Sequence, residues 1–168
     1  MNLISELKLG DLRTTGKSDE LAKKAINNPA IIEELIVAIN NEDKGVRMRA
    51  ADAVQKISEL KPETIKPYKK EFIKYCTINQ KEVRWHLAQI YPILDLTHHE
   101  RETILTKLQE WIKTDESNIV KVFCMQAIYD FSTKDESLKH LAKKVIMEAM
   151  KFNTPSINSR AKKLLKKL

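Results

Sequence analysis

Apolar residues recur along the chain at the spacing of one helical face, and the pattern returns at a fixed interval. In the first copy they stand at offsets 0, 4, 7, 8 and 11 from Val46, which places them on one stripe of an α-helix at about 100° per residue. The stripe recurs every 37 residues, and every position in it stays apolar. The copies are Val46, Ala50, Ala53, Val54 and Ile57; Val83, Leu87, Ile90, Tyr91 and Leu94; Val120, Cys124, Ala127, Ile128 and Phe131; and Ile157, Ala161, Leu164, Leu165 and Leu168. A repeat of this length predicts a solenoid of stacked helical units.

A second set of apolar columns lies between these stripes and predicts that each repeat is a pair of helices. Two of the columns are Ile31, Tyr68, Ile104 and Ala142, and Leu35, Phe72, Leu108 and Ile146. The second helix of each pair is predicted to begin at Asp43, near Gln80, at Ser117 and at Thr154; Asp, Ser and Thr are good helix caps. The predicted pairs are residues 29–40 with 43–60, 63–77 with 80–95, 98–114 with 117–132, and 135–151 with 154–168.

Residues 1–28 follow the repeat columns poorly, as expected of a terminal capping unit. A short helix over 2–9 is followed by a loop over 10–17 and by a second helix that begins at the cap Ser18. The sequence predicts an all-α fold: a right-handed α–α superhelix of four helix pairs with an N-terminal helical cap. Residues 1–168 are predicted to form one domain, with repeats at about 29–60, 63–95, 98–132 and 135–168.

The opening of the second helices resembles the HEAT repeat, an armadillo-type helical repeat. Residues 46–51 read Val-Arg-Met-Arg-Ala-Ala, the Val-Arg-x-x-Ala-Ala form of that family, and the resemblance covers residues 29–168. The chain as a whole is also similar to a group of small bacterial HEAT-repeat proteins. The resemblance implies a scaffold that binds proteins. A minority of such solenoids bind nucleic acid, including a group of DNA glycosylases that act on alkylated bases.

The helix face opposite the apolar stripe carries apolar side chains where solvent is expected. Three successive repeats place Met48, Trp85 and Val122 there, and Met125 and Tyr129 stand nearby in the third. In a HEAT-like stack this face lines the concave groove. A central Trp with Met neighbours is typical of a protein-binding hot spot. The alternative is that neighbouring helices cover these residues as ordinary core, and the sequence leaves both interpretations open.

Basic residues flank this groove and form a basic rim. They are Arg47, Arg84 and Lys121 on one side, and Arg49 and Arg160 on the other. The rim could contact phosphates while an aromatic side chain of the groove stacks on a base, or it could form salt bridges with nearby carboxylates. The formal net charge of +7 permits a nucleic-acid or an acidic protein partner and identifies neither.

The loop over 10–17 matches only the end of a phosphate-binding loop. Gly16-Lys17-Ser18 fits that motif, but Asp11 stands where its first Gly is required and no strand precedes it. Nucleotide binding by that mechanism is therefore not expected. Arg13, Gly16, Lys17 and Ser18 could still hold an anion through backbone amides and the helix N-terminus. The alternative is a turn that joins two capping helices.

No arrangement of residues in the sequence indicates catalysis or metal binding. His98-His99-Glu100 lacks a third spaced ligand, and a helix start capped by Thr97 is the better interpretation. Cys76 and Cys124 fall in apolar columns and are predicted to be buried thiols. The sequence therefore predicts a protein that is not an enzyme and has no metal or cofactor.

No stretch of the sequence indicates a membrane or secreted protein. The first residues carry no basic region leading into an apolar core, and no apolar run reaches membrane length. A cytoplasmic location and no membrane partner are therefore predicted.

We expect a non-catalytic scaffold that binds a protein or peptide in the concave groove of the second helices. A nucleic-acid-binding protein is the alternative, and a glycosylase acting on alkylated bases is its distant form. That enzyme would need a carboxylate beside an aromatic cleft, and Asp52, one turn beyond Met48, is the candidate. The sequence identifies neither the partner nor the oligomeric state.

Overall fold

The computed structural model describes residues 2–168, and the regular secondary structure of these residues is helical throughout. The chain forms two compact units, divided between Asp95 and Leu96. None of the helices in the described chain combines the length and apolar character that crossing a bilayer requires.

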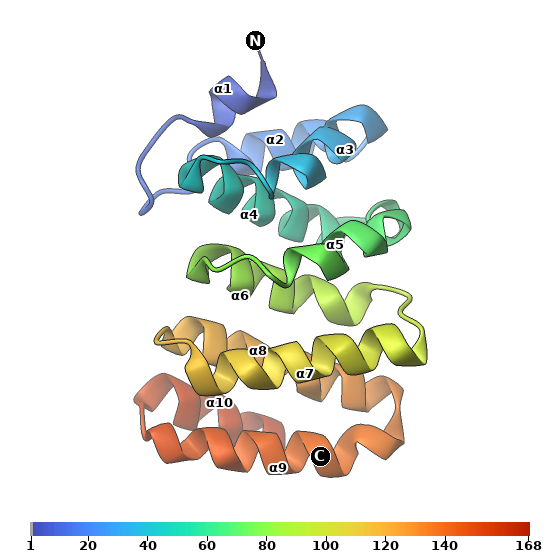
Figure 1. The fold of residues 1–168 in the computed structure, drawn as a ribbon, viewed down its shortest axis with the longest axis vertical. Coiled ribbons are helices and arrows are strands. Elements are labelled where there is room, and N and C mark those ends of the chain that lie inside the picture. Colours follow the sequence, from blue (N-terminus) through green and yellow to red (C-terminus); the bar gives the residue numbers. More distant parts are fainter. Residues whose placement is uncertain (1) are drawn as a thin grey trace. The chain divides into compact units, whose positions relative to one another are not determined.

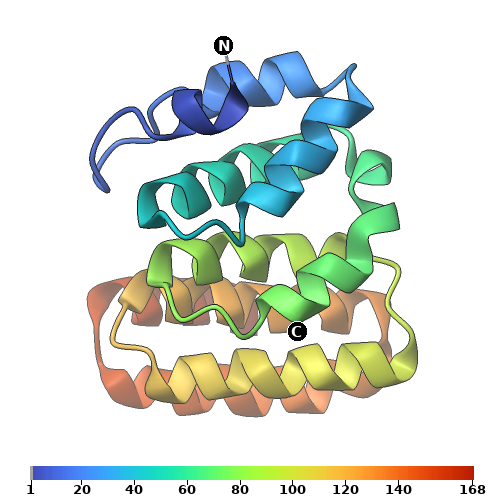
Figure 2. The ribbon, with the colours of Figure 1, turned by 45° about the horizontal axis from the view of Figure 1, so that its top comes forward.

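Unit 1 is built around a row of neighbouring helices. Its helices are α1 (Leu3–Leu7), α2 (Ser18–Ala25), α3 (Pro29–Ala38), α4 (Lys44–Leu60), α5 (Lys69–Tyr75) and α6 (Lys81–Ile90). Short 3₁₀ turns span Pro62–Thr64, Lys66–Tyr68 and Tyr91–Ile93. The long α4 packs between α2 and α6, and α3 and α1 also contact it (Figures 1 and 2). We call α2, α4 and α6 the inner helices of unit 1.

Unit 2 repeats the helix-pair design. It contains α7 (His98–Thr114), α8 (Asn118–Lys134), α9 (Lys139–Ala149) and α10 (Pro155–Leu165), with 3₁₀ turns at Glu136–Leu138 and Met150–Phe152. Helix α8 packs against α7, α9 and α10, and therefore forms the centre of this unit.

The predicted apolar stripe is the core of both units. All five positions that begin at Val46 are fully buried. The equivalent positions in the other repeats are also buried, except Leu165 and Leu168 at the end of the chain, which are half-buried. Full burial of one such aliphatic side chain is worth about 1.5–3 kcal/mol, so the stripe holds each helix against its neighbours.

Three predicted helix starts are confirmed by side-chain caps. The Asp43 carboxylate accepts the backbone N–H of Val46 at 3.0 Å, and Ser117 lies at the corresponding position of α8 and accepts from Val120. Thr97 and Glu100 form a capping box at the start of α7. Thr154 stands at the cap position of α10, although its side chain makes no capping hydrogen bond.

The prediction that Ser18 caps α2 is wrong. Lys17 is the cap residue, without a side-chain hydrogen bond, and Ser18 is the first residue of the helix. The hydroxyl of Ser18 donates instead to the Asp52 carboxylate of α4. A tertiary contact therefore replaces the local one.

The continuous helix predicted over 63–77 is also only partly correct. Two 3₁₀ turns occupy the first part, and the α-helix begins at Lys69. Pro62 is the first residue of one turn and Pro67 the second residue of the other, and a proline lacks the N–H that an α-helix interior needs. Pro92 has the same effect after α6, where the predicted helix gives way to the turn Tyr91–Ile93.

Candidate functional site

The residues predicted to line a groove differ in how far they reach solvent. Trp85, Val122 and Tyr129 are half-buried. Met48 and Met125 are buried, and Met125 has no exposed surface. The prediction that these two methionines lie on an open surface is wrong, because the helices that pack against α4 and α8 cover them. Trp85 is the member in unit 1 that a partner can reach.

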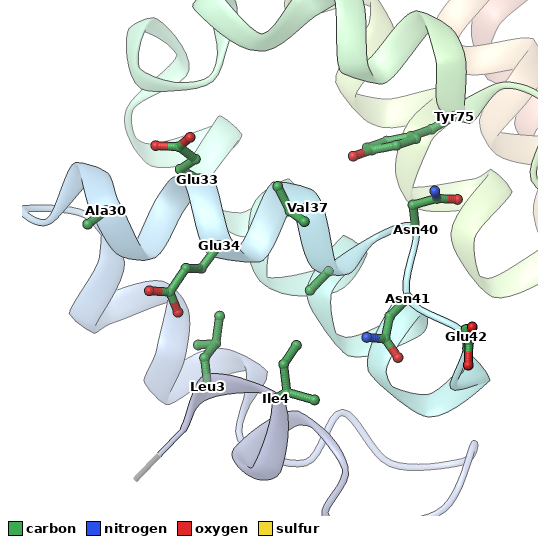
Figure 3. Close-up of a pocket in the computed structure, with 11 residues that line it drawn as sticks. Leu3, Ile4, Ala30, Glu33, Glu34, Val37, Asn40, Asn41, Glu42 and Tyr75 are labelled. Carbon is green, nitrogen blue, oxygen red and sulfur yellow. The ribbon is translucent and has the colours of Figure 1, made fainter.

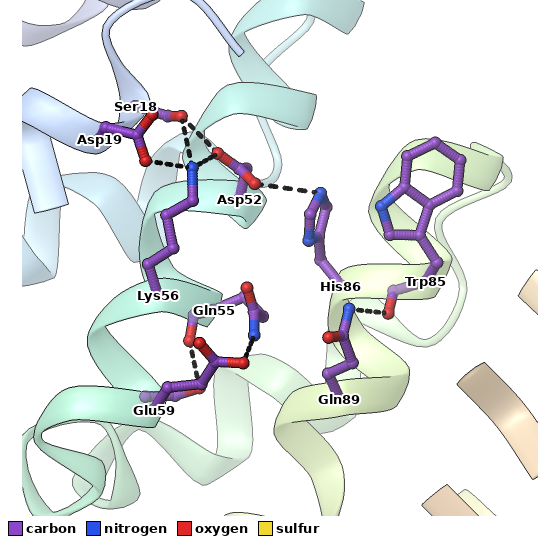
Figure 4. A network of polar contacts seen from close by, with 10 residues as sticks. Ser18, Asp19, Asp52, Gln55, Lys56, Glu59, Trp85, His86 and Gln89 are labelled. Carbon is purple, nitrogen blue, oxygen red and sulfur yellow. Dashed lines mark hydrogen bonds and ion pairs between the residues drawn. The ribbon is translucent and has the colours of Figure 1, made fainter. Parts of the chain in front are cut away.

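A polar network lies beside Trp85 on the inner helices of unit 1. The Asp52 carboxylate accepts the Ser18 hydroxyl and pairs with the Lys56 ammonium at 2.5 Å. Lys56 also pairs with Asp19 of α2 at 2.6 Å. Figure 4 shows these side chains converging between α2 and α4. The network joins the two helices, and it leaves Asp52 occupied by partners from its own chain.

His86 connects this network to Trp85. Its Nε2 lies 3.7 Å from an oxygen of Asp52, and its ring lies 5.6 Å from the Trp85 ring, centroid to centroid. Burial lowers the pKa of His86 to about 4, and this effect outweighs the opposing influence of the Asp52 carboxylate. His86 is therefore neutral at pH 7 and packs beside the indole as an uncharged ring.

Arg47 and Arg84 of the predicted basic rim hold the turns of their own repeats. Arg47 donates to the backbone carbonyl of Asn41, six residues earlier, and to the Gln80 side chain at 2.7 Å. Arg84 donates to the backbone carbonyl of Ile78, also six residues earlier. This shared contact gives the Val-Arg sequence a structural role, since it ties α4 and α6 each to the turn before it.

Arg49 does not face solvent, so the prediction that it belongs to the basic rim of the groove is wrong. Its side chain is buried, and its guanidinium donates to the backbone carbonyls of Leu7, at 2.8 Å, and Asp11. All three glycines of the chain lie against it: a Cβ added at Gly10, Gly16 or Gly45 would lie 3.1 Å or less from an Arg49 nitrogen. The loop over 10–17 therefore folds over this arginine.

Lys121 and Arg160, the rim residues in unit 2, also have partners within that unit. Lys121 is buried, and its ammonium lies 3.4 Å from the centre of the Phe152 ring, a cation–π contact. Arg160 donates to the Gln126 side chain at 2.8 Å. Lys121 is thus a packing residue, and its place on an open basic rim is a further incorrect prediction.

The structure brings together only some of the residues predicted to hold an anion, which are Arg13, Gly16, Lys17 and Ser18. Gly16 adopts a left-handed backbone with φ of 54°, and Ser18 begins α2. The Ser18 hydroxyl is bonded to Asp52, and the Lys17 ammonium lies 3.8 Å from the Glu6 carboxylate. Arg13 is exposed. The turn interpretation fits these contacts better, because the groups meant for an external anion already meet carboxylates of the chain.

The described residues show no grouping that suits a metal. Residues 2–168 contain no cluster of three or more His, Cys, Asp or Glu side chains placed to hold an ion. His98 and His99 are exposed in the first turn of α7, as the capping interpretation predicts. Cys76 and Cys124 are buried, as their apolar columns predict.

Unit 1 contains a pocket of about 820 Å³. The sequence pattern does not predict it. It lies beside α1 and α3 and is lined in part by Leu3, Glu33, Val37 and Tyr75 (Figure 3). One signal in the sequence points to it. Val37 stands outside the apolar columns of its helix and shares that helix with two adjacent glutamates, so an apolar and acidic outer face could have been expected.

Comparison with known proteins agrees with this architecture. The family model described as HEAT repeat domain matches residues 7–168. The chain therefore belongs to the HEAT repeat family, and its all-helical structure is consistent with an α–α superhelix.

Among solved structures, the chain is similar to a crystal structure of an engineered protein from the Northeast Structural Genomics Consortium. The TM-score is 0.59 at 19% sequence identity, and the match covers 96% of this chain and 78% of that chain. At this identity the likeness shows the fold alone. Among curated proteins nothing matches.

Proposed function

We propose that the chain is a non-catalytic scaffold that binds a protein or peptide partner on the inner helices of unit 1. The observation that carries the proposal is the half-exposed Trp85 of α6. HEAT repeat proteins commonly serve as interaction scaffolds, and Trp is among the residues most enriched at energetic centres of protein interfaces.

The surroundings of Trp85 support this role. Its ring packs beside the neutral His86, and its backbone carbonyl accepts the Gln89 side-chain amide at 3.0 Å (Figure 4). The ring contact with His86 restricts the indole before a partner arrives, so less conformational entropy is lost on binding. Gln89, one turn along α6, adds a polar group nearby, as in the polar rim of an interface.

The contacts of Asp52 argue against the glycosylase alternative. A catalytic carboxylate must be free to reach a substrate, whereas Asp52 is engaged by Ser18 and Lys56. The contacts of the basic rim argue against nucleic acid as the main partner, since Arg47 and Arg84 donate to backbone carbonyls. The proposal also includes a reducing, cytoplasmic compartment, which the buried thiols of Cys76 and Cys124 favour.

A pull-down with purified bait tests the proposal. Wild type, Trp85→Ala and Leu60→Ala are compared in one lysate, and circular dichroism checks that all three are folded. Leu60 is the matched control, because it is an apolar residue of unit 1 with 65% of its surface exposed. We expect a partner that wild type and Leu60→Ala retain and Trp85→Ala loses.

Two results would contradict the proposal. One is a partner retained equally by all three baits. The other is saturable DNA binding in fluorescence anisotropy that weakens steeply with salt and is lost in an Arg47→Ala/Arg84→Ala double variant, which would favour the nucleic-acid alternative.

A further inference from the structure

The pocket beside α1 and α3 has an apolar floor and acidic walls. Leu3 and Ile4 of α1 and Val37 of α3 provide apolar surface, and Val37 is 63% exposed. Three carboxylates, those of Glu33, Glu34 and Glu42, line the same space. Of the described residues around it, none is Lys, Arg or His.

The local charge is opposite to that of the whole protein. The chain carries a net charge of +7, yet Glu33, Glu34 and Glu42 make no ion pair or side-chain hydrogen bond within residues 2–168. Each carboxylate therefore keeps its full capacity to attract a cation from outside. A cationic ligand would meet a negative field here.

The geometry of α3 shows how the charges sit around the apolar centre. Glu33 and Val37 are one turn apart on the same helix, and Glu34 is rotated by about 100° from Glu33. Figure 3 shows the two carboxylates on opposite sides of α3, both on the Ala30 side of Val37, with Ile4 and Leu3 below. A ligand that covers Val37 and extends one turn toward the start of α3 therefore meets a carboxylate on either side of the helix.

Tyr75 adds a polar group to the pocket. It is largely buried on α5, and its hydroxyl makes no hydrogen bond within the described part of the chain. Figure 3 shows this hydroxyl turned toward α3. It can therefore donate to or accept from a backbone group of a bound segment.

We propose that this pocket, formed by α1, α3 and Tyr75, binds a segment of another protein in which an apolar side chain is flanked by Lys or Arg. The apolar side chain covers Val37 and the α1 residues, and the flanking cations meet Glu33 and Glu34. This surface is separate from the Trp85 face, so the proposal goes beyond the function proposed above.

A second copy of the chain fits the pocket less well. The strongly basic segment of this chain is α10 with the residues that follow it, where Lys162, Lys163, Lys166 and Lys167 are exposed. The apolar side chains of α10, namely Ile157, Ala161 and Leu164, are buried within unit 2. This helix offers cations without a free apolar anchor. In α9 the exposed Met147 lies near exposed lysines, but the exposed Glu148 follows it directly, and its charge would be repelled by the three carboxylates of the pocket. The proposal therefore commits to a different protein.

Fluorescence anisotropy of a labelled model peptide tests the inference at a fixed ionic strength of about 0.15 M. The probe is a peptide of Leu and Lys with Leu at helical spacing, and two further peptides replace every Leu with Ala or every Lys with Glu. The variants are Glu33→Gln/Glu34→Gln and Val37→Asn. The matched control is Glu102→Gln/Glu116→Gln, which removes the same charge from exposed positions in unit 2.

We expect the Leu/Lys peptide to bind wild type and the control variant equally. Binding to Glu33→Gln/Glu34→Gln and to Val37→Asn should be weaker by about tenfold or more, and the Ala and Glu peptides should bind wild type weakly. Equal affinities for all variants would overturn the proposal, as would equal binding of the Ala peptide. A wild-type dimer in sedimentation that Glu33→Gln/Glu34→Gln dissolves would also overturn it, because the occupant would then be a second copy.

Discussion

At the scale of single residues, the most informative side chains are ionisable groups held inside unit 1. Arg49 donates from its guanidinium to the backbone carbonyls of Leu7, at the end of α1, and of Asp11, in the loop over 10–17, and the three glycines of the chain give it room. His86 lies between Asp52 and Trp85 and stays neutral. Both residues serve the folded state, and Trp85 is left as the residue for recognition.

Replacing Gly16 with Ala tests the role of the loop around Arg49. The residue has φ of 54°, and an added Cβ would lie 2.8 Å from the Leu9 carbonyl oxygen and 2.9 Å from Arg49 Nε. We expect Gly16→Ala to lower the free energy of unfolding by about 1–3 kcal/mol in urea denaturation. Thr15→Ala, at an exposed neighbouring position, is the control, and equal stability of the two variants would show that the loop tolerates the side chain.

The neutral protonation state of buried His86 predicts that the stability of the fold depends on pH. The folded protein keeps His86 neutral down to about pH 4, whereas in the unfolded chain the imidazole takes up a proton near its ordinary pKa of 6.5. The unfolded state therefore binds more protons between these values, and the free energy of unfolding falls as pH drops from about 7 toward 4. The full loss of unfolding free energy from this one group is on the order of 3 kcal/mol.

Urea denaturation at several pH values measures this effect. His86→Gln should remove most of the decline between pH 7 and 5, while His140→Gln, at an exposed position of α9, should retain it. If His86→Gln and wild type lose stability in parallel, other groups control the acid response.

At the scale of elements, local signals predict where helices begin better than where they end or bend. Asp43, Thr97 and Ser117 cap helices as predicted, because the cap is a contact within one turn of the backbone. The 3₁₀ turns before α5 follow from Pro62 and Pro67. A prediction from the apolar columns alone does not take these prolines into account. Ser18 looks like a cap in sequence, but Asp52, distant in sequence, binds its hydroxyl.

Asp43→Ala tests the cap of α4. The hydrogen bond from the Val46 N–H holds the pKa of Asp43 below its ordinary value, so the ionised carboxylate stabilises the fold above that range. We expect a loss of about 1 kcal/mol of unfolding free energy at pH 7, measured by urea denaturation. Glu42→Ala, on an exposed residue of the same turn, should change stability little, and a similar loss in both variants would argue against a specific cap.

At the scale of the whole molecule, the period of 37 residues is enough to predict an all-helical repeat protein, and the family match over residues 7–168 confirms it. The candidate site is less predictable. Helical spacing gives the direction of a side chain but not which neighbours cover it, so the pattern places Met48, Met125, Arg49 and Lys121 on the surface although they are buried. The acidic pocket needs α1 beside α3, and nothing local in the sequence encodes that contact.

We propose that units 1 and 2 belong to one cooperative domain over residues 1–168. The chain offers one Trp in each unit, Trp85 in unit 1 and Trp111 in unit 2. Trp85→Phe and Trp111→Phe leave fluorescence from a single unit each. Within each variant, the fluorescence transition in urea should coincide with the transition seen by circular dichroism. Separate midpoints within one variant would mean that the units unfold independently.

The central claim is that Trp85 anchors a protein partner, and calorimetric titration of the purified partner measures it most directly. We predict that Trp85→Ala weakens binding by about 2 kcal/mol, or roughly 30-fold in Kd, while Leu60→Ala leaves Kd unchanged. Equal Kd values for wild type and a correctly folded Trp85→Ala would contradict the claim and place recognition elsewhere on the molecule.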